Sequence, residues 1–195
     1  MQYVDEQQLV QQCKTHSRVA QKVIYDRYAP LFYTICSRYS KDRHDAEQLL
    51  QDVFLKIFQN IHLYEAKGSF EGWMKKILVN TCLDFIKSKQ FKNEQLTIYP
   101  EELRDNYDRV SFNEAMHKIN MEPILAYIQK LSPTTRLVFN LFVFEGYSHK
   151  EIGKLTGMSE GTSQWHVNSA RTFLKNKIEH LLTRVKKKHE ESRFG

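Results

Sequence analysis

The sequence is poor in cysteine, proline and glycine, with 3, 4 and 7 of each among 195 residues. Cys13, Cys36 and Cys82 are widely spaced and form no Cys-x-x-Cys pair. An odd, sparse set of this kind excludes a disulfide framework and is typical of a reducing compartment. With few helix breakers and no long strand-like alternation, helical spacing of apolar residues dominates the chain.

Signals for catalysis, metal binding and membrane insertion are also missing. The 8 histidines form no His-Glu-x-x-His or paired Cys/His spacing, and the chain has no Gly-rich phosphate loop. Residues 1–14 include Asp5 and Glu6 where a signal peptide needs basic residues, and the densest apolar stretch, 137–144, is too short to span a bilayer. We therefore expect a cytoplasmic protein that is not an enzyme, has no catalytic residues, cofactor or metal, and does not insert into a membrane.

Charge is unevenly distributed along the chain. The formal net charge of +6 divides into +4 over residues 1–92, −3 over 93–120 and +5 over 121–195. Two basic ends around an acidic middle suit a protein that binds a polyanion with both ends. Many basic proteins bind no nucleic acid, so charge alone does not establish nucleic-acid binding and sequence motifs must decide.

Three helical patterns precede residue 90. The strongest, over 44–61, is one continuous apolar stripe, and a second over 19–35 contains Pro30, which predicts a kink or a break. A third covers 73–88. The residues expected to face inward are Ala46, Leu49, Leu50, Val53, Phe54, Ile57, Phe58 and Ile61 in the first pattern; Val19, Val23, Ile24, Tyr28, Leu31, Phe32 and Ile35 in the second; and Trp73, Ile77, Leu78, Thr81, Phe85 and Ile86 in the third.

The apolar rhythm fails over 90–120, where acidic residues gather, and resumes at Met121. Ser132-Pro133 then predicts the start of a helix over 134–145 that Gly146 ends. We expect an all-α protein of two helical domains, 1–92 and 121–185, joined by a flexible acidic linker over 93–120. A basic tail follows over 186–195, either as a solvated helix end or as a nucleic-acid contact.

The region after Gly146 predicts a helix-turn-helix. Ser148 and Glu151 form a capping box for a short helix that stops at Gly157, and Ser159 caps a longer helix reaching about Leu182. One face of the long helix is apolar and expected inside: Val167, Ala170, Leu174, Ile178 and Leu181. The candidate DNA contacts are Ser159, Thr162, Gln164, Trp165, Asn168, Ser169, Arg171 and Lys175. Gln and Asn can read adenine, while Trp165 either covers a thymine methyl or packs on a neighbouring helix.

Two sets of segments, in this order, resemble a known family. DAEQLLQDVF (45–54), GSFEGW (68–73) and VNTCLD (79–84) resemble the first conserved domain of the extracytoplasmic-function (ECF, group 4) RNA polymerase sigma factors. EGYSHKEIG (145–153), SEGTS (159–163) and the dipeptide at 170–171 resemble the second. A conventional helix-turn-helix regulator with a sensing or dimerising domain, and a helical enzyme, are the alternatives. A regulator predicts a symmetric operator, and an enzyme predicts a catalytic constellation.

The resemblance implies a subunit that binds core RNA polymerase through its beta′ clamp and beta flap. It would direct the enzyme to −10/−35 promoter DNA and help open it, and an anti-sigma factor is implied as a further partner. The polymerase-binding residues would be Glu47, Gln48, Gln51, Asp52 and Lys56. The family usually has Asp where this chain has Gln48. Without the resemblance this face is an ordinary solvated surface.

The −10 contacts implied by the resemblance lie in the loop from Leu63 and the helix after it: Tyr64, Ser69, Phe70, Lys76, Asn80, Asp84 and Lys87. Tyr64, Ser69 and Phe70 can wall a pocket for a flipped base, and Trp73 is either core or a stacking platform. The candidate DNA contacts of the long helix would read the −35 element. The family often has basic residues near Gln164 and His166. The linker would mimic nucleic acid in the polymerase or serve as a plain spacer.

Overall fold

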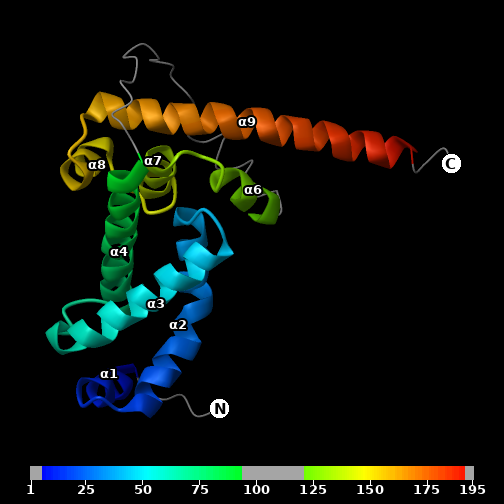
Figure 1. Cartoon of the computed structure of the whole chain (residues 1–195). Coiled ribbons are helices and arrows are strands. Elements are labelled where there is room, and N and C mark those ends of the chain that lie inside the picture. The colour runs from blue at the N-terminus through cyan, green and yellow to red at the C-terminus, as the bar shows by residue number, and fades with distance from the viewer. Residues whose placement is uncertain (1–5, 94–120, 192–195) are drawn as a thin grey trace. The chain divides into compact units, whose positions relative to one another are not determined.

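The computed structural model describes residues 6–93 and 121–191, and within these ranges all regular structure is helical. The chain divides into two compact units, Met1–Asn93 and Glu94–Gly195 (Figure 1). The all-α prediction is confirmed for the described residues. The expected linker lies, apart from Asn93, outside them.

The first unit contains α1 (Glu6–Lys14), α2 (Arg18–Tyr39), α3 (Arg43–Asn60), the 3₁₀ turn η1 (Ile61–Leu63) and α4 (Phe70–Asn93). Side-chain caps fix where two of these helices begin. The Ser17 hydroxyl accepts a hydrogen bond from the amide of Ala20, and the Asp42 carboxylate accepts one from the amide of Asp45. Helix α3 packs against both α2 and α4 (Figure 1). The apolar stripe of α3 is therefore covered from two sides.

The core of the first unit confirms the stripe predicted for α3. All of its members are buried except Phe58, which is half-buried. The Phe54 ring lies 5.6 Å from the Phe32 ring and 4.7 Å from the Tyr25 ring. Aromatic pairs at these distances stabilise beyond the area that they bury. Rings from α2 and α3 thus set the spacing of these two helices.

Helix α2 settles one of the two outcomes expected at Pro30 and differs from its prediction in which residues it buries. It runs through Pro30 without a break, although proline cannot donate to the preceding turn. Packing on both sides of the proline, by buried Tyr28 and Phe32, accounts for this continuity. Val19 and Leu31 were expected inside but are 75% and 42% exposed, because the buried stripe of α2 follows Ala20, Ile24, Tyr28 and Phe32 at steps of four.

Helix α4 buries a broader face than its pattern indicated. Leu78, Thr81 and Ile86 are buried as expected, whereas the expected Trp73, Ile77 and Phe85 are only half-buried. The sequence analysis missed the remaining core residues of α4, which are Phe70, Met74, Val79, Cys82 and Leu83. The helix starts three residues earlier than expected, and this start includes Phe70 in the helix, on its buried face.

The second unit contains α6 (Met121–Ile128), α7 (Pro133–Val143), α8 (His149–Thr156) and α9 (Glu160–Glu191). Ser132 caps α7 with Pro133 in its first turn, as expected, and the helix ends at Val143, two residues earlier than predicted. A core cluster joins α6, α7 and α9: Ile124, Ile128, Leu131, Phe139, Ala170 and Leu174, with Ile178 packed against it. Of the predicted inner face of α9, Leu181 lies among residues whose side chains are not described.

Three further findings concern the described residues as a whole. None of their helices is long and apolar enough to cross a membrane, and they contain no group of three potential metal-ligating side chains. The three cysteines are buried as free thiols, and burial raises the pKa of Cys13 to about 11. Cys13 is therefore protonated and unreactive at neutral pH.

Candidate nucleic-acid and polymerase interfaces

The turn between α8 and α9 is built by side-chain caps and one left-handed glycine. The Glu151 carboxylate accepts hydrogen bonds from the Ser148 amide (2.8 Å) and hydroxyl (2.7 Å), and these bonds lower the pKa of Glu151. Gly157 adopts φ +80° and donates its N–H to the Gly153 carbonyl at 2.8 Å. The predicted capping box and stop are both confirmed. They place α8 before α9 as a helix-turn-helix.

A close backbone approach completes this turn. A Cβ added at Gly153 would lie 2.8 Å from the carbonyl oxygen of Met158. The Ser159 hydroxyl accepts from the Thr162 amide at 3.0 Å and lies 2.9 Å from the Thr162 hydroxyl. Ser159 and Thr162, both expected at DNA, therefore also cap α9. They lie at the helix N-terminus, the end that enters a major groove in this motif.

Most of the residues expected at the −35 element reach the surface of α9. Gln164 and Lys175 are exposed, while Trp165, Asn168 and Ser169 are half-buried. The Trp165 ring meets the His166 ring edge-on at 5.0 Å, so part of it is packed and part accessible. Helix α9 thus carries amide, hydroxyl, indole and ammonium groups on its accessible side.

Arg171 does not join this surface. The residue is only 8% exposed, and its guanidinium lies over the Phe142 ring at 5.7 Å. The contact attaches α9 to α7. The expectation that Arg171 projects toward DNA is corrected, because its position faces the neighbouring helix.

The sequence analysis missed a buried polar network that orients α9. His166 is fully buried, and its Nδ1 lies 3.0 Å from the hydroxyl of Thr135, which also accepts a hydrogen bond from the Ser132 hydroxyl. Burial lowers the pKa of His166 to about 4, so the ring is neutral at pH 7. Position 166 therefore carries a neutral side chain that faces the core, where the family resemblance had implied a basic residue nearby.

A second histidine contact holds α8 against α9. The His149 ring stacks on Phe142 at 4.3 Å, and its Nδ1 lies 2.9 Å from the hydroxyl of buried Ser163. Periodicity could not find this pair, because His149 is the first residue of α8 and Ser163 is a small polar residue, and neither signals burial by itself.

On α3, four of the five residues expected at the polymerase lie on one accessible face. Arg43 donates to Glu47 at 2.7 Å, and Gln48 donates to Asp52 at 3.2 Å. Gln51 is exposed. The Gln48 to Asp52 hydrogen bond exists because position 48 is an amide, since a second carboxylate would repel Asp52. Position 48 thus affects how Asp52 is presented.

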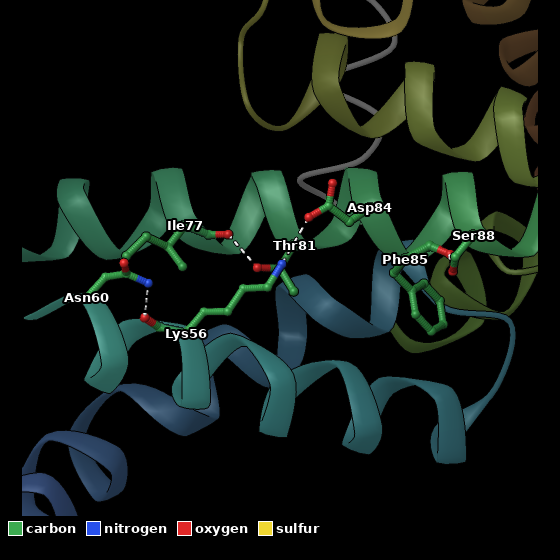
Figure 2. A network of polar contacts seen from close by, with 7 residues as sticks. All are labelled: Lys56, Asn60, Ile77, Thr81, Asp84, Phe85 and Ser88. Atoms are coloured by element: carbon green, nitrogen blue, oxygen red, sulfur yellow. Dashed lines mark hydrogen bonds and ion pairs between the residues drawn. The ribbon is translucent and has the colours of Figure 1, made fainter.

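Lys56, the fifth residue expected at the polymerase, directs its side chain toward α4. Its ammonium nitrogen donates to the Asp84 carboxylate of α4 at 2.9 Å (Figure 2). The structure thereby joins two residues that the sequence analysis had assigned to different partners.

One of the three residues expected to wall a pocket for a flipped −10 base is not accessible. Phe70 is 1% exposed and stacks on Trp73 at 5.8 Å, so it cannot form the surface of such a pocket. Tyr64 is half-buried, its hydroxyl donates to the Gly68 carbonyl at 2.7 Å, and its carbonyl accepts from Lys14 at 2.8 Å. The expectation for Phe70 is corrected. Tyr64 and Trp73 are the rings within reach of the surface.

The rest of the −10 set gathers as expected on one face of α4. The Ser69 hydroxyl accepts from the amide of Gly72 at 3.1 Å and so caps the helix. We call the four exposed residues that follow the α4 stripe: Lys76, Asn80, Asp84 and Lys87. Ammonium groups suit phosphates, and amide and carboxylate groups suit base edges.

A helical unit followed by a helix-turn-helix unit defines the class as an all-helical protein with a DNA-binding motif. Comparison with known proteins narrows it. The model of sigma-70 region 2 matches residues 24–92, and that of sigma-70 region 4 matches residues 121–174. Together they cover more than half of the chain. The chain belongs to the extracytoplasmic-function group of sigma-70 RNA polymerase sigma factors.

Individual relatives show how far the likeness extends. The chain is similar to the ECF RNA polymerase sigma factor SigE of Mycolicibacterium smegmatis, with 30% identity over 77% of this chain, and spans 58% of that relative's length. It is also similar to SigW of Bacillus subtilis, with 26% identity, 88% of this chain and 96% of the relative. Among solved structures, the sigma factor RpoE of Bartonella quintana, crystallised with the anti-sigma factor NepR, has a TM-score of 0.50 at 19% identity, covering 81% of this chain and 96% of that one. This last likeness concerns the fold alone.

Proposed function

We propose that this sigma factor binds core RNA polymerase, directs it to promoters with −10 and −35 elements, and promotes their opening. One observation carries the proposal: a region 2 match and a region 4 match occur in this order within one chain. A helix-turn-helix alone would support any DNA-binding regulator. The combination supports a subunit of the transcription machinery that does no chemistry of its own.

The accessible face of α3 is proposed to dock on the beta′ clamp. Glu47, Gln48, Gln51 and Asp52 present polar groups there, and none of them belongs to the core of the unit. Charged and polar surfaces of this kind govern association rate and partner choice more than raw affinity. The beta flap is the proposed contact of the second unit.

Opened −10 DNA is proposed to lie along the α4 stripe and the loop before it. Tyr64 and Trp73 can stack on an extruded base, and Asn80 can bond to its edge. Extrusion costs a few kcal/mol, which stacking on aromatic side chains at about 1–3 kcal/mol per base can offset. Lys76 and Lys87 would hold the strand's phosphates.

Duplex −35 DNA is proposed to receive the N-terminal half of α9. Gln164 and Asn168 are suited to adenine, and the half-exposed edge of Trp165 to a thymine methyl or a sugar. Ser159, Thr162, Ser169 and Lys175 would contact the backbone. The capping box and Gly157 fix the angle at which the helix is presented.

The two units are proposed to bind promoter DNA weakly at two places, and the polymerase sets the distance between them. Because the second binding event then becomes intramolecular, its effective concentration is on the order of millimolar. Residues 1–92 and 121–185 would be the two domains, 93–120 their tether and 186–195 a basic tail. The protein would work in the bacterial cytoplasm, where core polymerase and promoter DNA are found.

An anti-sigma factor is proposed as a further partner. The family resemblance implies one, and the related sigma factor of Bartonella quintana was crystallised with an anti-sigma factor. Such a partner would compete with core polymerase for the accessible face of α3.

Reconstitution tests the function directly. Purified protein is combined with bacterial core RNA polymerase, transcribed on genomic DNA, and the transcript starts are sequenced. Starts that share one upstream −10/−35 pair, absent when the protein is omitted, are expected. If a second sigma factor programs the same core and this protein programs none, the proposal fails.

The proposal that two weak DNA-binding units act together needs its own measurement. The free protein should bind a mapped promoter weakly and with strong salt dependence, whereas the holoenzyme binds it specifically. Tight, sequence-specific binding by the free protein, especially to a symmetric site, would instead identify a conventional regulator.

A further inference from the structure

Lys56 and Asp84 form an ion pair that connects α3 with α4. The Lys56 nitrogen and the Asp84 carboxylate oxygen are 2.9 Å apart, although the residues are 28 positions apart in the sequence. The Lys56 backbone is held in turn, since its carbonyl accepts from the Asn60 side-chain amide at 2.8 Å. Figure 2 shows the lysine side chain extended along α3 toward α4. Its charged end therefore belongs to the surface of α4.

Asp84 is the one acidic member of the α4 stripe. Lys76, Asn80 and Lys87 share its face and are all exposed, and the Asp84 side chain is itself 67% exposed. A bare carboxylate at this place would repel the phosphates of any strand bound along the stripe. It is also the side chain suited to accept a hydrogen bond from the amino group of cytosine.

We propose that Lys56 is a positioning residue for −10 recognition, which neutralises Asp84 and orients its carboxylate toward a base of the opened strand. Lys56 binds one carboxylate oxygen, Oδ2, and leaves Oδ1 to the base. The α4 stripe then offers a hydrogen-bond acceptor at Asp84, while the ion pair as a whole carries no net charge. The inference rests on the proposed function, and it moves Lys56 from the polymerase-facing set to the DNA-facing set.

The experiment measures binding of reconstituted holoenzyme to a fluorescent single strand. The probe is the non-template −10 strand of a promoter mapped by transcript sequencing. The variants are Lys56→Met, Asp84→Asn and the two combined, each compared with wild type at low and high salt. Affinity for core polymerase is measured in parallel.

The matched control is Lys75→Met. Lys75 pairs with Glu71 on the same helix at 2.7 Å, and the two side chains are 41% and 43% exposed. Lys75 lies about half a turn around α4 from Asp84. Lys75→Met therefore removes the same charge and a similar ion pair, but outside the α4 stripe.

Lys56→Met should weaken strand binding about two- to fivefold at low salt, the range expected for an exposed pair, and less at high salt. The combined variant should bind within about twofold of Asp84→Asn, because without the carboxylate there is no charge to neutralise. Affinity for core polymerase should stay unchanged in every variant, and Lys75→Met should bind the strand like wild type.

Three results would overturn the inference. If Lys56→Met weakens strand binding as much in the Asp84→Asn background as in wild type, Lys56 contacts the strand directly. If Lys56→Met weakens core binding and leaves strand binding intact, Lys56 belongs to the polymerase face. If wild-type holoenzyme binds the −10 strand no better than a scrambled strand, the proposed function fails together with the inference, whereas the first two results leave that function standing.

Discussion

The two units of the chain differ in how many buried polar side chains connect their helices. In the first unit the buried hydroxyls of Ser37, Ser40 and Thr81 each donate to the carbonyl four residues earlier, and the Tyr28 hydroxyl of α2 donates to Glu6 of α1 at 2.6 Å. The described part of the second unit buries Thr135, Arg136, Asn140, Ser163, His166 and Arg171, several of which connect one helix to another. Apolar packing tolerates small shifts, whereas buried polar contacts require exact partners. The second unit should therefore be the more sensitive to pH and to the loss of single atoms.

The largest expected effect tests whether the units are independent. Phe32→Ala removes a fully buried ring between α2 and α3 and should lower the free energy of unfolding of the first unit by about 3–5 kcal/mol. Hydrogen exchange read by mass spectrometry should show lost protection in residues 6–93 only. Equal loss in residues 121–179 would mean that the units fold as one, and the comparison would break.

Acid should act on the second unit first. The pKa of His166 falls from 6.5 to about 4 on folding, so the unfolded chain binds the extra proton between these values and stability falls as pH decreases from about 6.5 to 4. A shift of this size corresponds to at most about 3 kcal/mol. Thermal unfolding from pH 7.5 to 4.5 measures the loss.

His166→Gln is the control for the acid effect. This variant should be less stable at pH 7.5 but should show a flatter pH dependence of the second unit. An unchanged slope would assign the effect to other groups.

The helix-turn-helix depends on one left-handed residue. Gly157→Ala places a side chain at φ +80° and should destabilise the second unit by about 1–2 kcal/mol, with reduced −35 binding by the holoenzyme. Gly161→Ala is the matched control, because that glycine is helical and an added Cβ would meet only the Ser159 hydroxyl at 3.8 Å. It should stabilise by about 0.5–1 kcal/mol. Equal effects of the two variants would contradict the role given to Gly157.

Helix caps give a finer comparison of the two units. Ser148→Ala removes the hydrogen bond that the hydroxyl accepts from the Glu151 amide (3.3 Å) and the one that it donates to the Glu151 carboxylate (2.7 Å). It leaves the bond from the backbone amide of residue 148 in place and should cost about 1 kcal/mol. Ser17→Ala in the first unit removes one longer bond, 3.4 Å, and should cost about 0.5 kcal/mol. Chemical denaturation monitored separately in each unit gives both values. The reverse order would show that cap geometry does not set the stability of α8.

The smallest effect concerns Gln48. Gln48→Asp introduces the carboxylate that the family resemblance implies at this position, breaks the hydrogen bond to Asp52 and adds a like charge one turn away. It should destabilise α3 by about 0.2–0.5 kcal/mol and change core-polymerase affinity. Gln48→Ala removes the hydrogen bond without the charge. If both variants bind core polymerase like wild type, position 48 lies outside the interface.

Several elements could be read from the sequence because their determinants are local. The α3 stripe follows from the 3.6-residue period alone, and the capping box and Gly157 lie within ten residues of one another. Pro30 left a kink and a break both open for α2, and the structure shows a helix that continues through the proline. The order of the two family-like regions was also visible without coordinates.

Residue composition and local spacing by themselves determined an all-helical chain, the helix-turn-helix and most of the polar faces. Tertiary structure alone decided which polar residues turn inward, as Arg171 and His166 do, and that Phe70 is buried and does not reach the surface. It also decided that Lys56 reaches Asp84. A helical period specifies the angle of a side chain around its own axis, but its partner depends on which helix packs opposite, and that is set by contacts distant in sequence.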